Sequence, residues 1–158
     1  MTTTKLYTDA ELNTLRSMPK KVLNPGARWN QKPRSRPAHS QRNYQVVGMN
    51  DDKARFMIYL RQNLEDETDF SCGISYLAKG ALPLTLARYN GPSHIHGDID
   101  FQPHIHRATE RAIAAGKRAE SEADATDRFE TLQGALACLL ADFAINGLNA
   151  DYDQPGLF

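Results

Sequence analysis

The chain has 158 residues, 41% of them hydrophobic, and its equal numbers of basic and acidic side chains give no formal net charge. This length fits one folded domain with a sizeable core. Its apolar runs are shorter than the ~18 residues of a membrane helix, and the first residues lack the apolar centre of a signal peptide, so we expect a cytoplasmic protein without a membrane partner. The two cysteines form no Cys-x-x-Cys pair, which favours reduced, buried thiols.

The charges are unevenly distributed along the chain. Residues 12–50 contain no acidic side chain and eight basic ones, whereas residues 51–158 contain seventeen acidic and ten basic ones. A basic N-terminal arm therefore precedes an acidic body.

A short helix over residues 9–18 is the first predicted element. Thr8 and Glu11 have the spacing of a capping box, and Pro19 ends the helix. Residues 19–43 carry four prolines and many charges, which predict no regular element but either a disordered linker or an arm that Trp29 pins onto the body. We therefore divide the chain into an N-terminal helix with a basic arm, residues 1–43, and a single α+β domain, residues 44–158.

Four segments with alternating apolar and polar side chains follow, and they predict strands over residues 44–49, 54–62, 70–77 and 82–90. The turns between them are too short for parallel crossovers. Two His-Ile-His triplets come next, then a predicted helix over residues 108–115 and a longer one from Thr126 to about Gly147. The expected fold class is α+β: an antiparallel meander of four to six strands packed against a C-terminal amphipathic helix.

The histidine triplets suggest a metal site. Four of the five histidines, His94, His96, His104 and His106, lie within thirteen residues. Because side chains at i and i+2 share a face of a strand, each triplet points both imidazoles the same way. On paired strands the four would converge, three sufficing for a catalytic zinc or iron site and four for a structural one. A divalent transition metal such as zinc is therefore one candidate cofactor.

A second hypothesis needs no metal. With Arg107, Glu110 and Arg111 nearby, the same histidines would supply the general base, general acid and cations that RNA cleavage through the 2′-hydroxyl demands. A third hypothesis treats the histidines as ordinary polar residues of a β-hairpin.

The basic arm predicts binding of RNA or DNA, because its cations suit a phosphate backbone and its aromatic rings suit stacking on bases. The expected binding residues are Lys20, Lys21, Arg28, Trp29, Lys32, Arg34, Arg36 and Arg42. Alternatively, the arm contacts the acidic body or a protein partner of complementary charge.

Several motifs between residues 56 and 148 resemble a family of small bacterial hypothetical proteins. They are Asp69-Phe-Ser71, Arg88-Tyr-Asn-Gly91, Ser93-His94, His104-Ile-His-Arg-Ala-Thr-Glu-Arg111 and Thr126-Asp-Arg-Phe129. The resemblance implies a prokaryotic protein of an accessory gene, and it carries over no catalytic residue because the family has no established activity.

Three functions are compatible with these features. The leading one is a small nucleic-acid-directed protein, either a histidine-dependent phosphodiesterase or a toxin-like ribonuclease. The main alternative is a non-enzymatic protein-interaction module, such as an inhibitor or an antitoxin-type partner. A small-molecule metalloenzyme with a histidine-rich site comes third.

Overall fold

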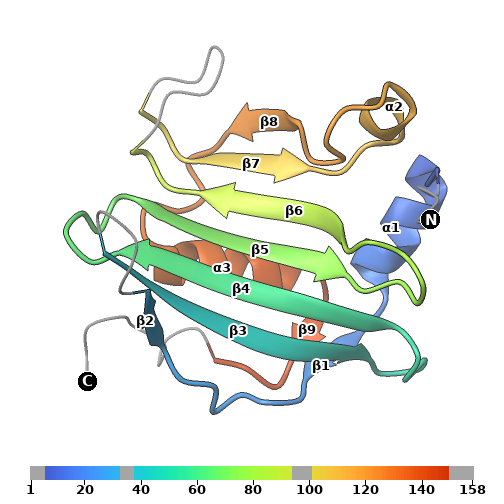
Figure 1. Cartoon of the computed structure of the whole chain (residues 1–158), viewed down its shortest axis with the longest axis horizontal. Helices are drawn as coiled ribbons and strands as arrows, with labels where there is room; N and C mark the ends of the chain where they lie inside the picture. Colours follow the sequence, from blue (N-terminus) through green and yellow to red (C-terminus); the bar gives the residue numbers. More distant parts are fainter. Residues whose placement is uncertain (1–5, 33–37, 94–100, 150–158) are drawn as a thin grey trace.

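The computed structural model describes residues 6–32, 38–93 and 101–149. These residues form a mixed α+β fold, a mostly antiparallel sheet of nine strands with three helices (Figure 1). The predicted fold class is confirmed, but four to six strands was too few. The helices are α1 (Asp9–Ser17), α2 (Glu110–Ala114) and α3 (Leu132–Asp142). The strands are β1 (Lys20–Val22), β2 (Asn30–Lys32), β3 (His39–Gly48), β4 (Arg55–Asn63), β5 (Phe70–Tyr76), β6 (Leu84–Asn90), β7 (His104–Arg107), β8 (Glu122–Ala125) and β9 (Ile145–Asn146).

The strand order is β8-β7-β6-β5-β4-β3-β1-β9, with β2 also paired to β3. From β3 to β8 each strand pairs antiparallel with the next, as the short turns predict, whereas β1 and β9 pair in parallel. The second histidine triplet lies in β7. The four other strands outside the sequence prediction, β1, β2, β8 and β9, are short, and their side chains are largely polar. Strands of two to four residues at the margins of a sheet carry too little alternation to be recognised in a sequence.

The N-terminal segment belongs to the folded core. The capping box at α1 is confirmed, since Thr8 Oγ1 accepts from Glu11 N and the Glu11 carboxylate accepts from Thr8 N. Leu12 and Leu15 of α1 and Val22 of β1 are buried in the same core as the sheet. The expectation that residues 19–43 hold no regular element was therefore wrong, because β1 and β2 fit between the prolines.

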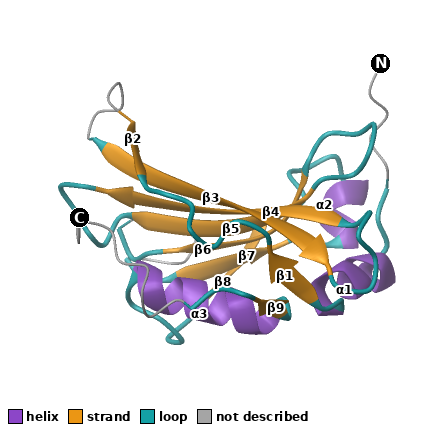
Figure 2. Ribbon diagram, turned by 90° about the horizontal axis from the view of Figure 1, so that it is seen from below, coloured by secondary structure: helices purple, strands orange, loops and turns teal. Residues whose placement is uncertain are grey.

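The core lies between the sheet and α3, which packs along β4, β5 and β6 (Figure 2). The apolar stripe predicted for the C-terminal helix is confirmed by buried Leu132, Leu136 and Leu139. The helix begins later than predicted, with Thr131 as its N-cap. Thr126 cannot begin it, because its backbone N–H extends the sheet by donating to Pro103 O at 2.9 Å.

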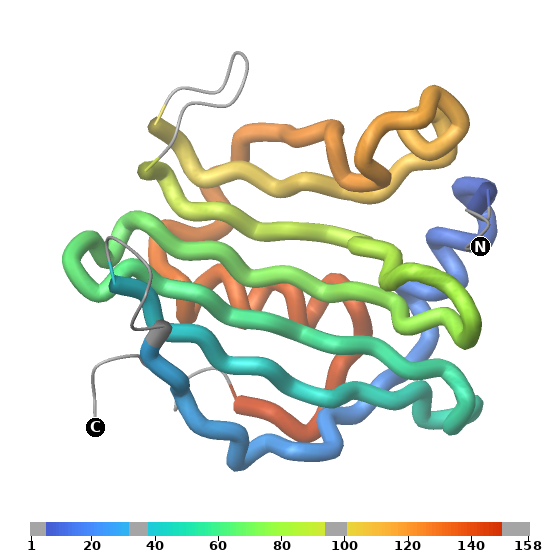
Figure 3. Tube along the Cα trace, in the orientation of Figure 1, coloured from blue at the N-terminus to red at the C-terminus, as the bar shows by residue number. Residues whose placement is uncertain are grey.

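The helices α1 and α2 lie side by side although about a hundred residues separate them (Figure 3). Asp9 N donates to the Glu110 carboxylate at 2.9 Å, and Glu110 N donates to the Asp9 carboxylate at the same distance. Each carboxylate thus accepts a hydrogen bond from a backbone N–H in the first turn of the other helix. Within the described ranges, no helix combines the length and apolarity that crossing a bilayer requires.

Candidate functional site

Two rows of mainly polar residues cross the sheet on the face opposite α3, which we call the open face. Cross-strand partners point to the same side of a sheet, so the register fixes these rows. One row contains Tyr59, Gly73, Arg88 and His106, and the other contains Arg61, Ser71, Asn90 and His104. Each row takes one residue from each of β4, β5, β6 and β7.

A hollow of about 280 Å³ opens on this face. It is lined by His39, Tyr59, Arg61, Asp69, Phe70, Ser71, Arg88 and Asn90. The lining combines two guanidinium groups, one imidazole, one carboxylate and two hydroxyls. We call it the open-face hollow.

A directional chain of hydrogen bonds forms the floor of this hollow. His104 Nδ1 lies 3.1 Å from Gln102 O and donates to it, because a carbonyl only accepts, and Nε2 is the ring nitrogen that faces Asn90. Asn90 Nδ2 faces this Nε2 at 3.4 Å. Asn90 Oδ1 then accepts from Ser71 Oγ at 2.8 Å, so Tyr59 donates to Ser71 at 3.1 Å. The hydroxyl protons are thus used within the chain, and the guanidinium groups remain as donors toward the hollow.

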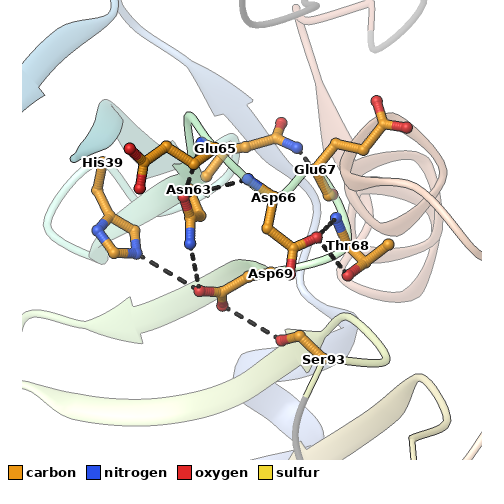
Figure 4. A network of polar contacts seen from close by, with 9 residues as sticks. His39, Asn63, Glu65, Asp66, Glu67, Thr68, Asp69 and Ser93 are labelled. Carbon is orange, nitrogen blue, oxygen red and sulfur yellow. Dashed lines mark hydrogen bonds and ion pairs between the residues drawn. The ribbon is translucent and has the colours of Figure 1, made fainter. Parts of the chain in front are cut away.

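His39 and Asp69 lie together at the end of the hollow (Figure 4). His39 Nε2 lies 3.6 Å from Asp69 Oδ2. The Asp69 carboxylate also accepts from Asn63 Nδ2 at 3.2 Å and from Ser93 Oγ at 3.3 Å. Asn63 Oδ1 in turn accepts the backbone N–H groups of residues 65 and 66, which fixes the loop that carries Asp69. The carboxylate is therefore held in place beside the imidazole.

Arg88 occupies the centre of the open face. Its Nε is buried and has no hydrogen-bond partner among the described residues. Its Nη1 lies 3.9 Å from Glu120, whose carboxylate Arg118 approaches more closely, at 3.2 Å. A buried donor without a partner costs free energy, and the Arg88 side chain as a whole is 24% exposed, so its outer nitrogens are accessible. Arg88 is thus a cation with donor capacity left for a ligand.

Tyr59 remains a neutral phenol in this setting. Burial raises its pKa, against the opposing effect of the nearby Arg88 guanidinium. Its ring lies directly against Gly73, where a Cβ atom would fall 2.3 Å from the ring carbon Cε1. Glycine at position 73 therefore makes room for the aromatic wall of the hollow.

The predicted histidine cluster is only partly described. His104 and His106 point to the same face, as the i, i+2 rule predicts, with ring centroids 5.1 Å apart. Both are buried, 2% and 3% exposed, and His106 Nδ1 donates to Glu120 O at 2.9 Å. His94 and His96 lie outside the described residues. Within the described part of the chain, no three His, Cys, Asp or Glu side chains are grouped so that they could hold a metal.

The other predicted catalytic residues lie away from the open-face hollow. Arg107 follows the histidines but points to the opposite face, in register with Ala87. Glu110 exchanges hydrogen bonds with Asp9, as described above. Arg111 forms a two-point ion pair with Glu122. The structure therefore does not bring these three side chains together with His104 and His106.

The predicted basic arm is divided among several environments. Lys20 is fully buried, and its Nζ donates to three backbone carbonyls. Arg42 lies over the rings of Trp29 and Tyr44, and Trp29 packs against the core. Lys21 and Arg28 are exposed. Lys32 is in β2, and Arg34 and Arg36 lie outside the described residues. The acidic residues after α2 are ordered as well: Glu120 is buried, and β8 begins at Glu122.

The residues of the open-face hollow were missed in the sequence, although a signal for them exists. Apolar side chains occupy positions 56, 58 and 60, so the odd positions of β4 share the opposite face. The same alternation in β5 assigns Ser71 to that face. The alternation does not give the register that aligns the four strands. His39 was missed for another reason, because it lies in residues 19–43, for which no strand was predicted.

Comparisons with known proteins give no further assignment. No protein-family model, curated protein or solved structure matches this chain.

Gly73→Ala is expected to disturb the open-face hollow, because the new methyl group would overlap the Tyr59 ring. Overpacking of this kind costs about 1–3 kcal/mol. The matched control is Gly26→Ala, where a Cβ meets nothing within 4 Å and an effect within about 0.5 kcal/mol is expected. Urea unfolding of both variants measures the difference. Equal stabilities would show that Tyr59 does not pack against Gly73 in solution.

Proposed function

We propose that this protein cleaves single-stranded RNA at the open-face hollow by a metal-independent attack of the 2′-hydroxyl on the adjacent phosphodiester. The observation that supports this proposal is the lining of the hollow. A His–Asp pair and two arginines from different strands meet there on the face of the sheet opposite α3.

The chemistry needs a base for the 2′-hydroxyl and cations for the phosphorane-like transition state. His39, oriented by Asp69, is the base and takes the 2′-hydroxyl proton. The 2′-oxygen bonds to phosphorus, and the bond from phosphorus to the 5′-oxygen breaks. The 5′-oxygen takes a proton from water at the mouth of the hollow. The products are a 2′,3′-cyclic phosphate and a 5′-hydroxyl end.

The two arginines supply the electrostatic part of this mechanism. Arg61 and Arg88 lie on β4 and β6, on either side of β5, so a phosphate in the hollow is approached from two directions. Guanidinium groups match phosphate oxygens geometrically and stay charged throughout. The neutral Tyr59 phenol adds an aromatic wall to the hollow without adding negative charge.

Incubation of the whole protein with a mixed-sequence RNA and with the DNA of the same sequence, both in a metal chelator, tests this proposal. We expect cleavage of the RNA to cyclic-phosphate ends and no cleavage of the DNA, which lacks the 2′-hydroxyl. An intact RNA after prolonged incubation with folded protein, or equal cleavage of both strands, would refute the ribonuclease. Salt-dependent binding of RNA without cleavage would instead favour a nucleic-acid-binding module.

Arg88→Ala is expected to lower the single-turnover cleavage rate about 10²-fold, the usual effect of removing one donor to a developing charge. The control is Arg55→Ala, which removes an exposed arginine at the far end of β4 and should leave the rate within about 3-fold of wild type. Thermal melting of both variants shows whether they are folded. Equal rates for the two variants would show that Arg88 does not act on the phosphate.

A further inference from the structure

A second polar hollow, of about 320 Å³, lies on the other face of the sheet, which we call the arginine hollow. Ala87 and Tyr89 of β6 share this face with Arg107 of β7. The full lining is Arg16, Ala87, Tyr89, Arg107, Arg128, Asp142 and Phe143. The three arginines come from α1, from β7 and from the segment before α3, so they approach one space from three elements.

The one carboxylate among the described residues of this lining is already paired. Asp142 accepts two hydrogen bonds from the Arg128 guanidinium, at 2.8 and 2.9 Å, and a third from the Tyr89 hydroxyl at 2.5 Å. A two-point arginine–carboxylate pair neutralises both charges and fixes the geometry of both groups. Arg128 and Asp142 thus form a neutral wall of the hollow.

The other two arginines keep most of their positive charge. Arg107 lies 3.9 Å from Asp124, but the Asp124 side chain is 84% exposed and that of Arg107 is 45% exposed, so water screens this pair. Arg16 donates to the neutral Asn13 amide at 3.0 Å, and its guanidinium lies 5.8 Å from the centre of the Phe143 ring. Neither contact neutralises Arg16. The hollow therefore has an excess of about two positive charges.

We propose that the arginine hollow binds the phosphate group of a phosphate monoester. A monoester carries nearly two negative charges at neutral pH, which matches the two cations left over. Its oxygens point in several directions, which suits guanidinium groups that come from different elements. The ligand is either a small phosphorylated molecule or the phosphorylated end of a nucleic acid, since both present the same group.

Calorimetric titration with inorganic phosphate tests this site in the full chain. Because the open-face hollow also holds two arginines, the titrations are made on Arg88→Ala protein, in which that hollow has lost one of them. We expect Arg16→Gln and Arg107→Gln, each added to Arg88→Ala, to weaken phosphate binding at least 10-fold. Asp124→Asn should strengthen it. Arg55→Gln, the matched control for loss of one exposed arginine, should change it less than 3-fold. Arg128 is left intact because it pairs with Asp142.

Absence of phosphate binding by the Arg88→Ala protein, or binding unchanged by both Arg16→Gln and Arg107→Gln, would overturn the proposal. Two further titrations identify the source of the ligand. Tighter binding of a 5′-phosphorylated oligonucleotide than of its 5′-hydroxyl form would assign the site to a strand end. Tighter binding of a phosphorylated mononucleotide than of that oligonucleotide would assign it to a small molecule. Loss of ribonuclease activity in the assay above would leave this result unaffected, since phosphate binding is measured directly.

Discussion

His39→Ala is expected to lower the rate of RNA cleavage by about 10²- to 10⁴-fold, the usual contribution of a positioned general base. Without the imidazole, the 2′-hydroxyl must lose its proton to water. Binding of RNA should change little, because the two arginines of the open-face hollow remain. The effect should therefore fall on kcat and not on KM.

Single-turnover cleavage measured across pH checks this role. In the wild-type protein the acid limb of the pH–rate profile reports deprotonation of the base, and in His39→Ala this limb should disappear. Asp69→Asn keeps the hydrogen-bonding shape but removes the charge that orients His39, so we expect an intermediate loss. Wild-type rates in His39→Ala with an unchanged profile would exclude His39 as the base.

Lys20→Ala is expected to lower the free energy of unfolding by about 5 kcal/mol. The Lys20 side chain is buried, and its Nζ donates to Arg16 O, Met18 O and Phe143 O at 3.0, 2.9 and 2.8 Å. Each buried carbonyl left without a donor costs about 1 kcal/mol or more, and the cavity adds about 2 kcal/mol. Lys20→Met fills the cavity, so its free energy of unfolding should fall by only about 3 kcal/mol. Lys21 is exposed, so Lys21→Ala should leave the free energy of unfolding almost unchanged.

The pH dependence of stability gives a second test of Lys20. Burial, and then the nearby Arg16, lower the pKa of Lys20 from 10.5 to about 8. Between these values the unfolded chain binds more protons than the folded one, so the stability due to Lys20 rises as pH increases. Relative to Lys20→Met, the free energy of unfolding of the wild-type protein should rise by about 3 kcal/mol between pH 8 and pH 10.5. A constant difference over this range would show that Lys20 has an ordinary pKa.

The alternation of apolar and polar residues was sufficient to predict the central strands, because one side of each strand packs against α3. It also placed His104 and His106 on a common face. It could not show that both rings are buried: the partner of His106, for example, is Glu120 O, fourteen residues later in the chain. The sequence around Glu120 does not indicate that this residue is buried, because its partners, Arg88 and Arg118, are recognisable only from the folded chain.

The candidate site was harder to predict than the fold for a physical reason. Its residues are ordinary polar side chains on separate strands, and only the pairing of Tyr59 with Gly73 and of Ser71 with Asn90 brings them together. The histidine triplets are conspicuous in the sequence, but their described members, His104 and His106, are not among the residues that line the open-face hollow. His39 does line it, although nothing near it in the sequence suggests catalysis.

The parallel pairing of β1 with β9 joins segments about 125 residues apart, with Lys20 opposite Ile145. Because the chain is synthesised from its N-terminus, β1 leaves the ribosome long before β9 is made. The edge of β1 that pairs with β9 therefore stays unpaired until synthesis is almost finished. The central meander can assemble earlier from neighbouring hairpins, because their loops are short. The sheet is therefore completed late in synthesis. A chain whose synthesis stops before residue 145 would expose the unpaired edge of β1, which can pair with strands of other chains and cause aggregation.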